Sequence, residues 1–212
     1  MDVWISIISI MAALLLGAMS PGPSFVIVAR NSVLLSRADG AATALGMGVG
    51  GVVFCGMALA GFYSLLASVE WLYVTVKVAG ALYLFHIASQ IWSGASKPLD
   101  LVTEPVDRER DFLKSFWMGF STQLSNPKTA LVYGGIFVAL LPQNVPFWCY
   151  PVLIVMTFLV EAGWYAIVAL AFSSSRPKEI YLNAKSIIDR AAALTIGALG
   201  VKLILTSSEL GS

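Results

Sequence analysis

Long apolar runs dominate the pattern of hydrophobic and polar positions along this chain. Six windows are apolar enough to cross a bilayer core as helices, which takes about 20 residues each. They run over roughly residues 4–28, 41–66, 70–92, 113–141, 147–172 and 187–206. The runs are too long for strands and lack two-residue alternation, and helices satisfy their own backbone hydrogen bonds in lipid. The pattern therefore predicts an all-α integral membrane protein with six transmembrane helices.

Composition and charge support this class and exclude others. The chain is 58% hydrophobic and 12% charged, whereas soluble domains carry about 25% charged residues. A net charge of +1 offers no basic footprint for nucleic acid. Two cysteines and one histidine are too few for a disulfide framework or a multi-ligand metal site. We therefore expect the lipid bilayer as a partner, and no nucleic acid, metal or other cofactor.

The first apolar window could be mistaken for a secretory signal peptide. Asp2 and no basic residue precede it, and the small triplet Ala18-Met19-Ser20 is followed by Pro21, which disfavours cleavage. We expect this segment to be retained as the first span.

Lysine and arginine positions predict the orientation, because cytoplasmic loops of membrane proteins are enriched in these residues. Ten of the 13 lie in the connections after the first, third and fifth spans, and none lies in the opposite loops. We expect these connections in the cytoplasm and both termini on the periplasmic side. The ten are Arg30, Arg37, Lys97, Arg108, Arg110, Lys114, Arg176, Lys178, Lys185 and Arg190.

A charged connection, residues 93–112, divides the chain into two halves, 1–92 and 113–212, of three spans each. Because three is odd, the second half must run inverted relative to the first, as is common in secondary transporters. Six of the nine prolines lie in connections or near span ends. The other three lie inside the opening span of each half, as Pro21 and Pro23 in one and Pro127 in the other. The expected fold is two inverted three-helix repeats, each opening with a proline-broken helix.

The two breaks are the first candidates for a binding site. Proline lacks an N–H and crowds the carbonyl four residues earlier, and Gly22 permits unusual torsions. Ser20-Pro21-Gly22-Pro23 and Asn126-Pro127-Lys128 should therefore expose backbone groups within the membrane. Amides at the start of a half-helix favour a carboxylate, and carbonyls at an end favour an ammonium group, which suits a zwitterion. The alternative is that both breaks are structural kinks.

These two motifs carry a resemblance to a known family. Together they resemble the lysine exporter superfamily, nearest its homoserine and threonine exporter branch. Val160-Glu161-Ala162-Gly163-Trp164 and Ile188-Asp189-Arg190 match as well, whereas Ser24 departs from an acidic residue that follows the Pro-Gly-Pro of a relative. The resemblance implies a secondary transporter of the bacterial inner (plasma) membrane. It implies export of amino acids, here a neutral or polar one such as threonine or homoserine, driven by the proton gradient.

Glu161 is the most informative single residue. It lies near the middle of the fifth span, where a lone carboxylate costs about 3 kcal/mol or more. We expect it to bind the substrate ammonium group, to carry the coupled proton, or both in turn. The alternative is a structural ion pair with Lys128 or Lys77. On the same face, three and four residues further on, Trp164 and Tyr165 are candidates for a cation–π wall, with ordinary helix packing as the alternative.

Polar side chains around the second break complete the candidate substrate site. Lys128 suits a substrate carboxylate or Glu161, and Gln123 and Asn126 lie on one helix face. The alternative role of these two amides is to bind carbonyls freed by the break. The candidate substrate-binding residues are Ser20, Pro21, Gly22, Pro23, Gln123, Asn126, Pro127, Lys128, Glu161 and Trp164.

Three further features have structural interpretations beside functional ones. His86 is expected to be a helix-contact histidine rather than a proton shuttle. Asp189 and Arg190 are expected to form an interfacial pair or a gate contact. The Gly46-x-x-x-Gly50 pattern permits close helix contact, either within one protomer or in a homodimer.

Among the classes of protein, a secondary amino-acid exporter fits these features best. A metal-ion or small-cation permease is the alternative, but it would usually show clustered His, Cys, Met or acidic ligands. The chain has no nucleophile-plus-base constellation that would point to an enzyme. A purely structural protein would not need two broken helices.

Overall fold

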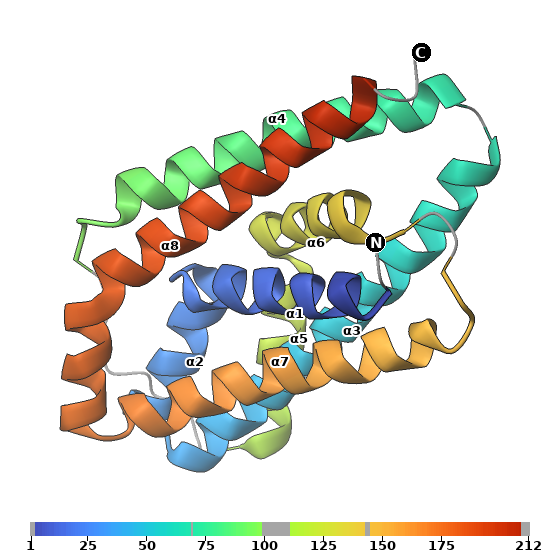
Figure 1. Ribbon diagram of the computed structural model, residues 1–212. Coiled ribbons are helices and arrows are strands. Elements are labelled where there is room, and N and C mark those ends of the chain that lie inside the picture. Colours follow the sequence, from blue (N-terminus) through green and yellow to red (C-terminus); the bar gives the residue numbers. More distant parts are fainter. Residues whose placement is uncertain (1–2, 69, 99–110, 143–144, 209–212) are drawn as a thin grey trace.

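The computed structural model describes residues 3–68, 70–98, 111–142 and 145–208, which form eight α-helices. They are α1 (Val3–Met19), α2 (Pro23–Leu34), α3 (Arg37–Ser68), α4 (Glu70–Gly94), α5 (Phe112–Leu124), α6 (Pro127–Leu140), α7 (Cys149–Phe172) and α8 (Ser175–Ser208). Each half supplies two short helices separated by a break and then two long ones (Figure 1). The all-α prediction is confirmed for the described residues.

The helices are arranged in three layers (Figure 1). α4 packs along α8 on one side, α3 packs against α5 and α7 on the other, and α1 and α6 lie between. The largest apolar core lies where the layers meet, and Ile10, Leu84, Ile136 and Ile196 are fully buried in it. α1 begins and α8 ends at the same end of the bundle, as expected for an even number of crossings.

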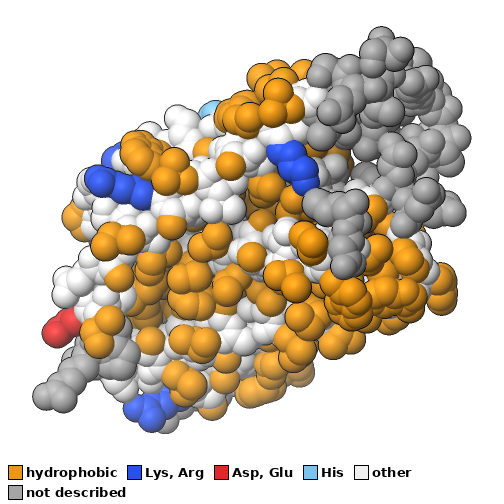
Figure 2. All heavy atoms as spheres, viewed as in Figure 1, with side chains coloured by type: hydrophobic (Ala, Val, Ile, Leu, Met, Phe, Trp, Pro, Cys, Tyr) orange, Lys and Arg blue, Asp and Glu red, His pale blue; other side chains and the backbone are white. Residues whose placement is uncertain are grey.

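The outer surface is that of a membrane protein. Figure 2 shows hydrophobic side chains over most of the visible face, and Ile8, Leu82, Ile187 and Leu194 are each more than half exposed. By length and composition, Arg37–Gly61 of α3 and the whole of α7 are each able to cross a membrane, and the bent pair α1–α2 would make a third crossing. The full set of six spans and their inverted relation stay predictions.

Both proline breaks fall where the sequence places them. α1 ends at Met19, and α2 begins at Pro23 after a bend of 60°. Pro23 and Pro127 occupy the first turn of their helices, where the missing N–H costs little. The expectation of an unusual torsion at Gly22 is not met, because its backbone is extended, with φ −146° and ψ −172°.

Two helices extend beyond the expected spans. Residues 23–34 form a helix that carries Arg30 past the apolar window ending near residue 28. α8 begins at Ser175, well before the window that starts near residue 187. A hydropathy window detects only the apolar part of such helices, and Pro177 is tolerated in the first turn of α8.

The second half begins at a capped helix that is tied to α3. The Asp111 carboxylate accepts hydrogen bonds from the amides of Leu113 at 2.9 Å and Lys114 at 3.1 Å. The amide of Lys114, foremost, holds the pKa of Asp111 below its usual value. Asp39 of α3 accepts from the Asp111 amide at 3.2 Å and from the Ser115 hydroxyl at 2.8 Å. These bonds fix the start of α5 against the start of α3.

Glycines allow α3 and α5 to approach each other backbone to backbone. A Cβ built on Gly46 would lie 2.1 Å from the Phe116 carbonyl oxygen, and one on Gly119 would lie 2.1 Å from the Thr43 carbonyl oxygen. Small residues at helix contacts are a common device in membrane proteins. The predicted close packing at Gly46 is therefore confirmed, and it occurs within one chain.

The same face of α3 continues toward the centre of the molecule. A Cβ on Gly50 would lie 2.7 Å from the Gln123 Cβ, and one on Gly51 would lie 2.9 Å from the Glu161 Cγ. α3 therefore brings two candidate site residues, from α5 and α7, onto one glycine-lined surface.

We expect Gly46→Ala to destabilise the protein by about 1–3 kcal/mol, because the added methyl group must push the α5 backbone away. Gly56→Ala in the same helix is the matched control, since its Cβ meets nothing within 4 Å. It should be neutral or slightly stabilising. Thermal unfolding in detergent measures both variants, and equal Tm values would contradict this account of the α3–α5 contact.

Candidate functional site

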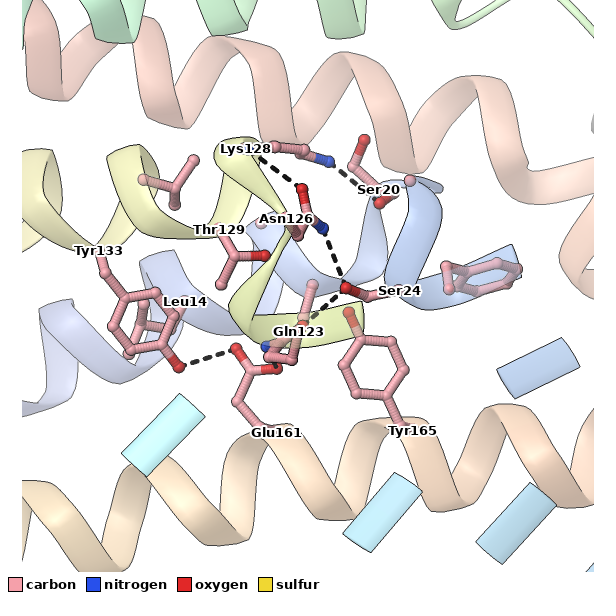
Figure 3. Close-up of a pocket in the computed structure, with 15 residues that line it drawn as sticks. Leu14, Ser20, Ser24, Gln123, Asn126, Lys128, Thr129, Tyr133, Glu161 and Tyr165 are labelled. Atoms are coloured by element: carbon pink, nitrogen blue, oxygen red, sulfur yellow. Dashed lines mark hydrogen bonds between the residues drawn. The ribbon is translucent and has the colours of Figure 1, made fainter. Parts of the chain in front are cut away.

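The two breaks and the middle of α7 enclose a small cavity (Figure 3). Its volume is about 20 Å³, room for about one water-sized group. α1, α2, α5, α6 and α7 all contribute to its lining. The polar lining residues are Ser20, Ser24, Gln123, Asn126, Lys128, Thr129, Tyr133, Glu161 and Tyr165.

A chain of hydrogen bonds connects the second break to Glu161 through Ser24, at the start of α2 in the other half (Figure 3). The Asn126 side-chain amide donates to the Ser24 hydroxyl at 2.9 Å, and this hydroxyl donates to the side-chain Oε1 of Gln123 at 2.6 Å. The Gln123 amide then donates to Glu161 Oε2 at 3.1 Å. At the other carboxylate oxygen, the Tyr133 hydroxyl donates at 2.9 Å. All five side chains are buried, so the two halves share one polar core.

The hydrogen-bond partners of Glu161 are neutral groups. Ion pairs among the described residues join Lys114 to Asp111 and Lys185 to Asp189, and Glu161 is in neither. Lys128 instead donates to the Ser20 carbonyl oxygen at 3.2 Å. A direct ion pair between Glu161 and Lys128 is therefore not formed in this structure, and the side chain of Lys77 lies outside those described.

The carbonyls freed at the end of α1 are each bound by a side chain from elsewhere. Trp164 Nε1 donates to the Ala18 carbonyl at 3.1 Å, and the Tyr181 hydroxyl donates to the Met19 carbonyl at 3.0 Å. Lys128 binds the next carbonyl, at Ser20. Three donors from α6, α7 and α8 thus satisfy a helix end that lipid would leave unpaired.

The structure brings most of the predicted site residues together. Six of them line the cavity: Ser20, Gly22, Gln123, Asn126, Lys128 and Glu161. The three prolines line an adjacent groove: Pro21, Pro23 and Pro127. Trp164 lines neither, because its indole binds Ala18 and its ring lies beside that of Tyr181, 6.5 Å between centroids. Tyr165, the next residue, lines the cavity in its place.

Among the polar residues of the cavity, sequence reasoning missed Ser24, Thr129 and Tyr133. Ser24 directly follows the first break, so its place at the start of a half-helix was a usable signal. Thr129 and Tyr133 are four residues apart, so they lie on one face of α6, the helix that begins at the second break. The partners of these side chains could not be predicted, since Ser24 and Gln123 are 99 residues apart in the chain.

The adjacent groove has a volume of about 310 Å³ and runs from the breaks to α8. Asp189, on its wall, pairs with Lys185 at 2.8 Å, whereas Arg190 lies over the Trp92 ring, 5.6 Å from its centroid. Asp189 and Arg190, expected to form an interfacial pair or a gate contact, thus each interact with a different partner. No group of three or more His, Cys, Asp or Glu side chains gathers in the described part of the chain.

An apolar helical exterior around a buried polar site at two broken helices is characteristic of membrane transporters. The LysE type translocator family matches residues 15–207, and this chain belongs to that family. The protein is therefore a transporter and not an enzyme.

Individual relatives match over nearly the same length. The threonine efflux protein of Salmonella typhi is 30% identical over 189 residues, 89% of this chain and 92% of the relative. That of Escherichia coli (strain K12) is 28% identical over 190 residues, with the same two shares. The uncharacterized membrane protein YahN of the same strain is 25% identical over 186 residues, 87% of this chain and 82% of the relative. No solved structure matches the chain.

We expect Trp164→Phe to destabilise the protein by about 1–3 kcal/mol, because the Ala18 carbonyl loses its donor while remaining partly shielded from water. Trp117→Phe, at a half-exposed tryptophan, is the matched control and should change stability little. Thermal unfolding of the purified variants measures the effect. A Trp164→Phe variant of normal Tm that binds substrate weakly would instead support the cation–π role.

Proposed function

We propose that this protein exports neutral or polar amino acids, such as threonine or homoserine, across the bacterial inner membrane in exchange for protons. The observation that carries the proposal is the buried Glu161 carboxylate, which neutral donors hold at the end of a hydrogen-bond chain between the two breaks. The names and coverage of the threonine efflux relatives support the same substrate class.

The charges at the site suit a zwitterion. The cavity lining contains one carboxylate, Glu161, and one ammonium group, Lys128. The substrate ammonium binds Glu161, and the substrate carboxylate binds Lys128 at the start of α6, where the helix dipole also favours an anion. Ser24 and Asn126 supply hydrogen-bonding groups for a side-chain hydroxyl. A dibasic substrate would bring a second positive charge with no second carboxylate in the cavity.

Substrate binding at Glu161 requires the cavity to open. Its volume of about 20 Å³ accommodates a water-sized group and not an amino acid. The substrate must displace internal bonds, and that of Lys128 to Ser20 is the one that a carboxylate would replace. Opening at the breaks therefore accompanies binding, as alternating access around a central site requires.

Proton coupling is proposed because the direct hydrogen-bond partners of Glu161 are neutral. A carboxylate buried among neutral partners needs a proton or a cation close by, because an uncompensated charge is costly inside a membrane. Glu161 would bind the substrate ammonium group during export and a proton while the empty transporter returns. This alternation exchanges one proton for one amino acid and leaves the carboxylate compensated in both directions.

The orientation proposed from the lysines and arginines completes the scheme. The ends of α2, α4 and α7, which lie next to the basic connections, are at the cytoplasmic face, and both termini lie in the periplasm. Substrate then enters from the side of the charged 93–112 connection. A C-terminal reporter that is active only in the cytoplasm would contradict this topology.

The first test uses Glu161→Gln in proteoliposomes loaded with radiolabelled threonine. In the wild type, an imposed pH gradient should accelerate efflux. The variant should lose this acceleration by at least about tenfold, because the amide cannot carry the proton or compensate the ammonium charge. Ser93→Ala, at an exposed polar residue that lines neither the cavity nor the adjacent groove, is the control and should keep the acceleration. Proton-driven efflux that persists in Glu161→Gln would remove Glu161 from the mechanism.

The second test measures substrate class. Wild-type vesicles are loaded in turn with threonine, homoserine, lysine and a divalent metal cation. Efflux of the two neutral amino acids at rates at least about tenfold above lysine is expected from the single carboxylate of the cavity. Transport of the metal cation without any amino acid would favour the small-cation permease.

A further inference from the structure

We propose that the groove beside the breaks is a second amino-acid site, in which Asp189 binds the substrate ammonium and Lys128 binds its carboxylate before transfer to the inner cavity. This inference rests on the proposed function, because it assigns the same substrate class to a second place along the route.

The groove has the size that the inner cavity lacks. Its volume of about 310 Å³ compares with about 20 Å³ inside, and ligand sites begin at about 300 Å³. The two spaces share four lining residues, Ser20, Gly22, Asn126 and Lys128. The groove therefore adjoins the inner site, and it is the space large enough for an amino acid in this conformation.

Lys185 has no remaining capacity to bind a substrate carboxylate. Its ammonium group donates to Asp189 Oδ2 at 2.8 Å, to the Gly94 carbonyl at 3.0 Å and to the Ala95 carbonyl at 3.5 Å. An ammonium group has three N–H donors, so these acceptors use them all. Lys185 thus joins the end of α4 to α8 and positions Asp189.

Asp189 keeps one unused acceptor in the wall of the groove. The side chain is 3% exposed, and its Oδ1 has no hydrogen-bond partner among the described residues. A buried acceptor without a donor is unfavourable, so a donor from a ligand would be bound with a gain in free energy. The terminal torsion of aspartate is broad, so a modest rotation presents Oδ1 to the groove while Oδ2 keeps Lys185.

Lys128 supplies the opposite charge and connects the two sites. Its side chain lines both spaces, of which the inner one contains Glu161 and the groove contains Asp189. A zwitterion in the groove meets Asp189 with its ammonium and Lys128 with its carboxylate. The substrate then moves into the inner site when its ammonium group passes from Asp189 to Glu161 while its carboxylate stays bound to Lys128.

The test measures equilibrium binding of radiolabelled threonine and its efflux in Asp189→Asn, Glu161→Gln and Lys185→Gln. Asp189→Asn should weaken binding and raise the KM for efflux at least about tenfold, while efflux at saturating threonine stays proton-driven. Glu161→Gln should bind threonine within about threefold of the wild type yet lose proton-driven efflux. Lys185→Gln keeps the carboxylate, so it should lower Tm with a smaller change in KM than Asp189→Asn.

Normal KM in a folded Asp189→Asn variant overturns the second site and leaves the proposed function intact. Equal losses of Tm and of maximal rate in Asp189→Asn and Lys185→Gln, without a KM effect, also overturn it, since the pair would then be structural. Wild-type protein that transports no amino acid overturns the proposed function, and the second site with it.

A thiol-protection experiment keeps the inference testable if Asp189→Asn does not fold. Gln90 is exposed and lines the groove, whereas Cys55 and Cys149 are buried. In Gln90→Cys, threonine should slow labelling by a maleimide severalfold, and it should do so equally when Glu161→Gln is added. Protection that disappears with Glu161→Gln would place the bound amino acid in the inner cavity and overturn the groove site.

Discussion

The structure depends on the close contact of α3 with its neighbours through glycine. Gly46 and Gly119 let the backbones of α3 and α5 meet, and Gly50 and Gly51 leave space for Gln123 and Glu161. A side chain at any of these positions would separate the helices that supply the polar core. Because Glu161 obtains a donor from Gln123 only at this spacing, the packing of apolar helices and the compensation of a buried carboxylate are one constraint.

The second constraint is the satisfaction of backbone groups at the breaks. A broken helix inside a membrane is stable only when protein groups bind its free carbonyls. Trp164, Tyr181 and Lys128 do this for the end of α1, and each comes from a different helix. The break is thus held by side chains of three other helices. If Lys128 binds the substrate as proposed, binding there would release the Ser20 carbonyl and so affect the first break.

In the proposed scheme, the two spaces that Lys128 lines bind the substrate one after the other. The inner cavity holds the buried carboxylate and is too small for an amino acid, whereas the groove is large enough and contains a second carboxylate. Lys128 lines both spaces and so lies between the two carboxylates along the proposed route. A substrate that passes from one carboxylate to the other keeps its ammonium group compensated, which avoids the cost of a lone charge in the membrane.

Local features of the chain determined its membrane class, the two breaks and the residues flanking them, because length, apolar composition and proline act through neighbouring residues. The positions of Gln123 and Asn126 at the second break and of Glu161 in the middle of an apolar span are likewise visible in the local sequence. Tertiary structure alone decided that Ser24 joins Asn126 to Gln123, that Trp164 binds a carbonyl, and that Glu161 has neutral partners. These outcomes depend on contacts between segments of both halves, about 100 residues or more apart for Ser24 and Trp164, and hydropathy or spacing cannot specify such contacts.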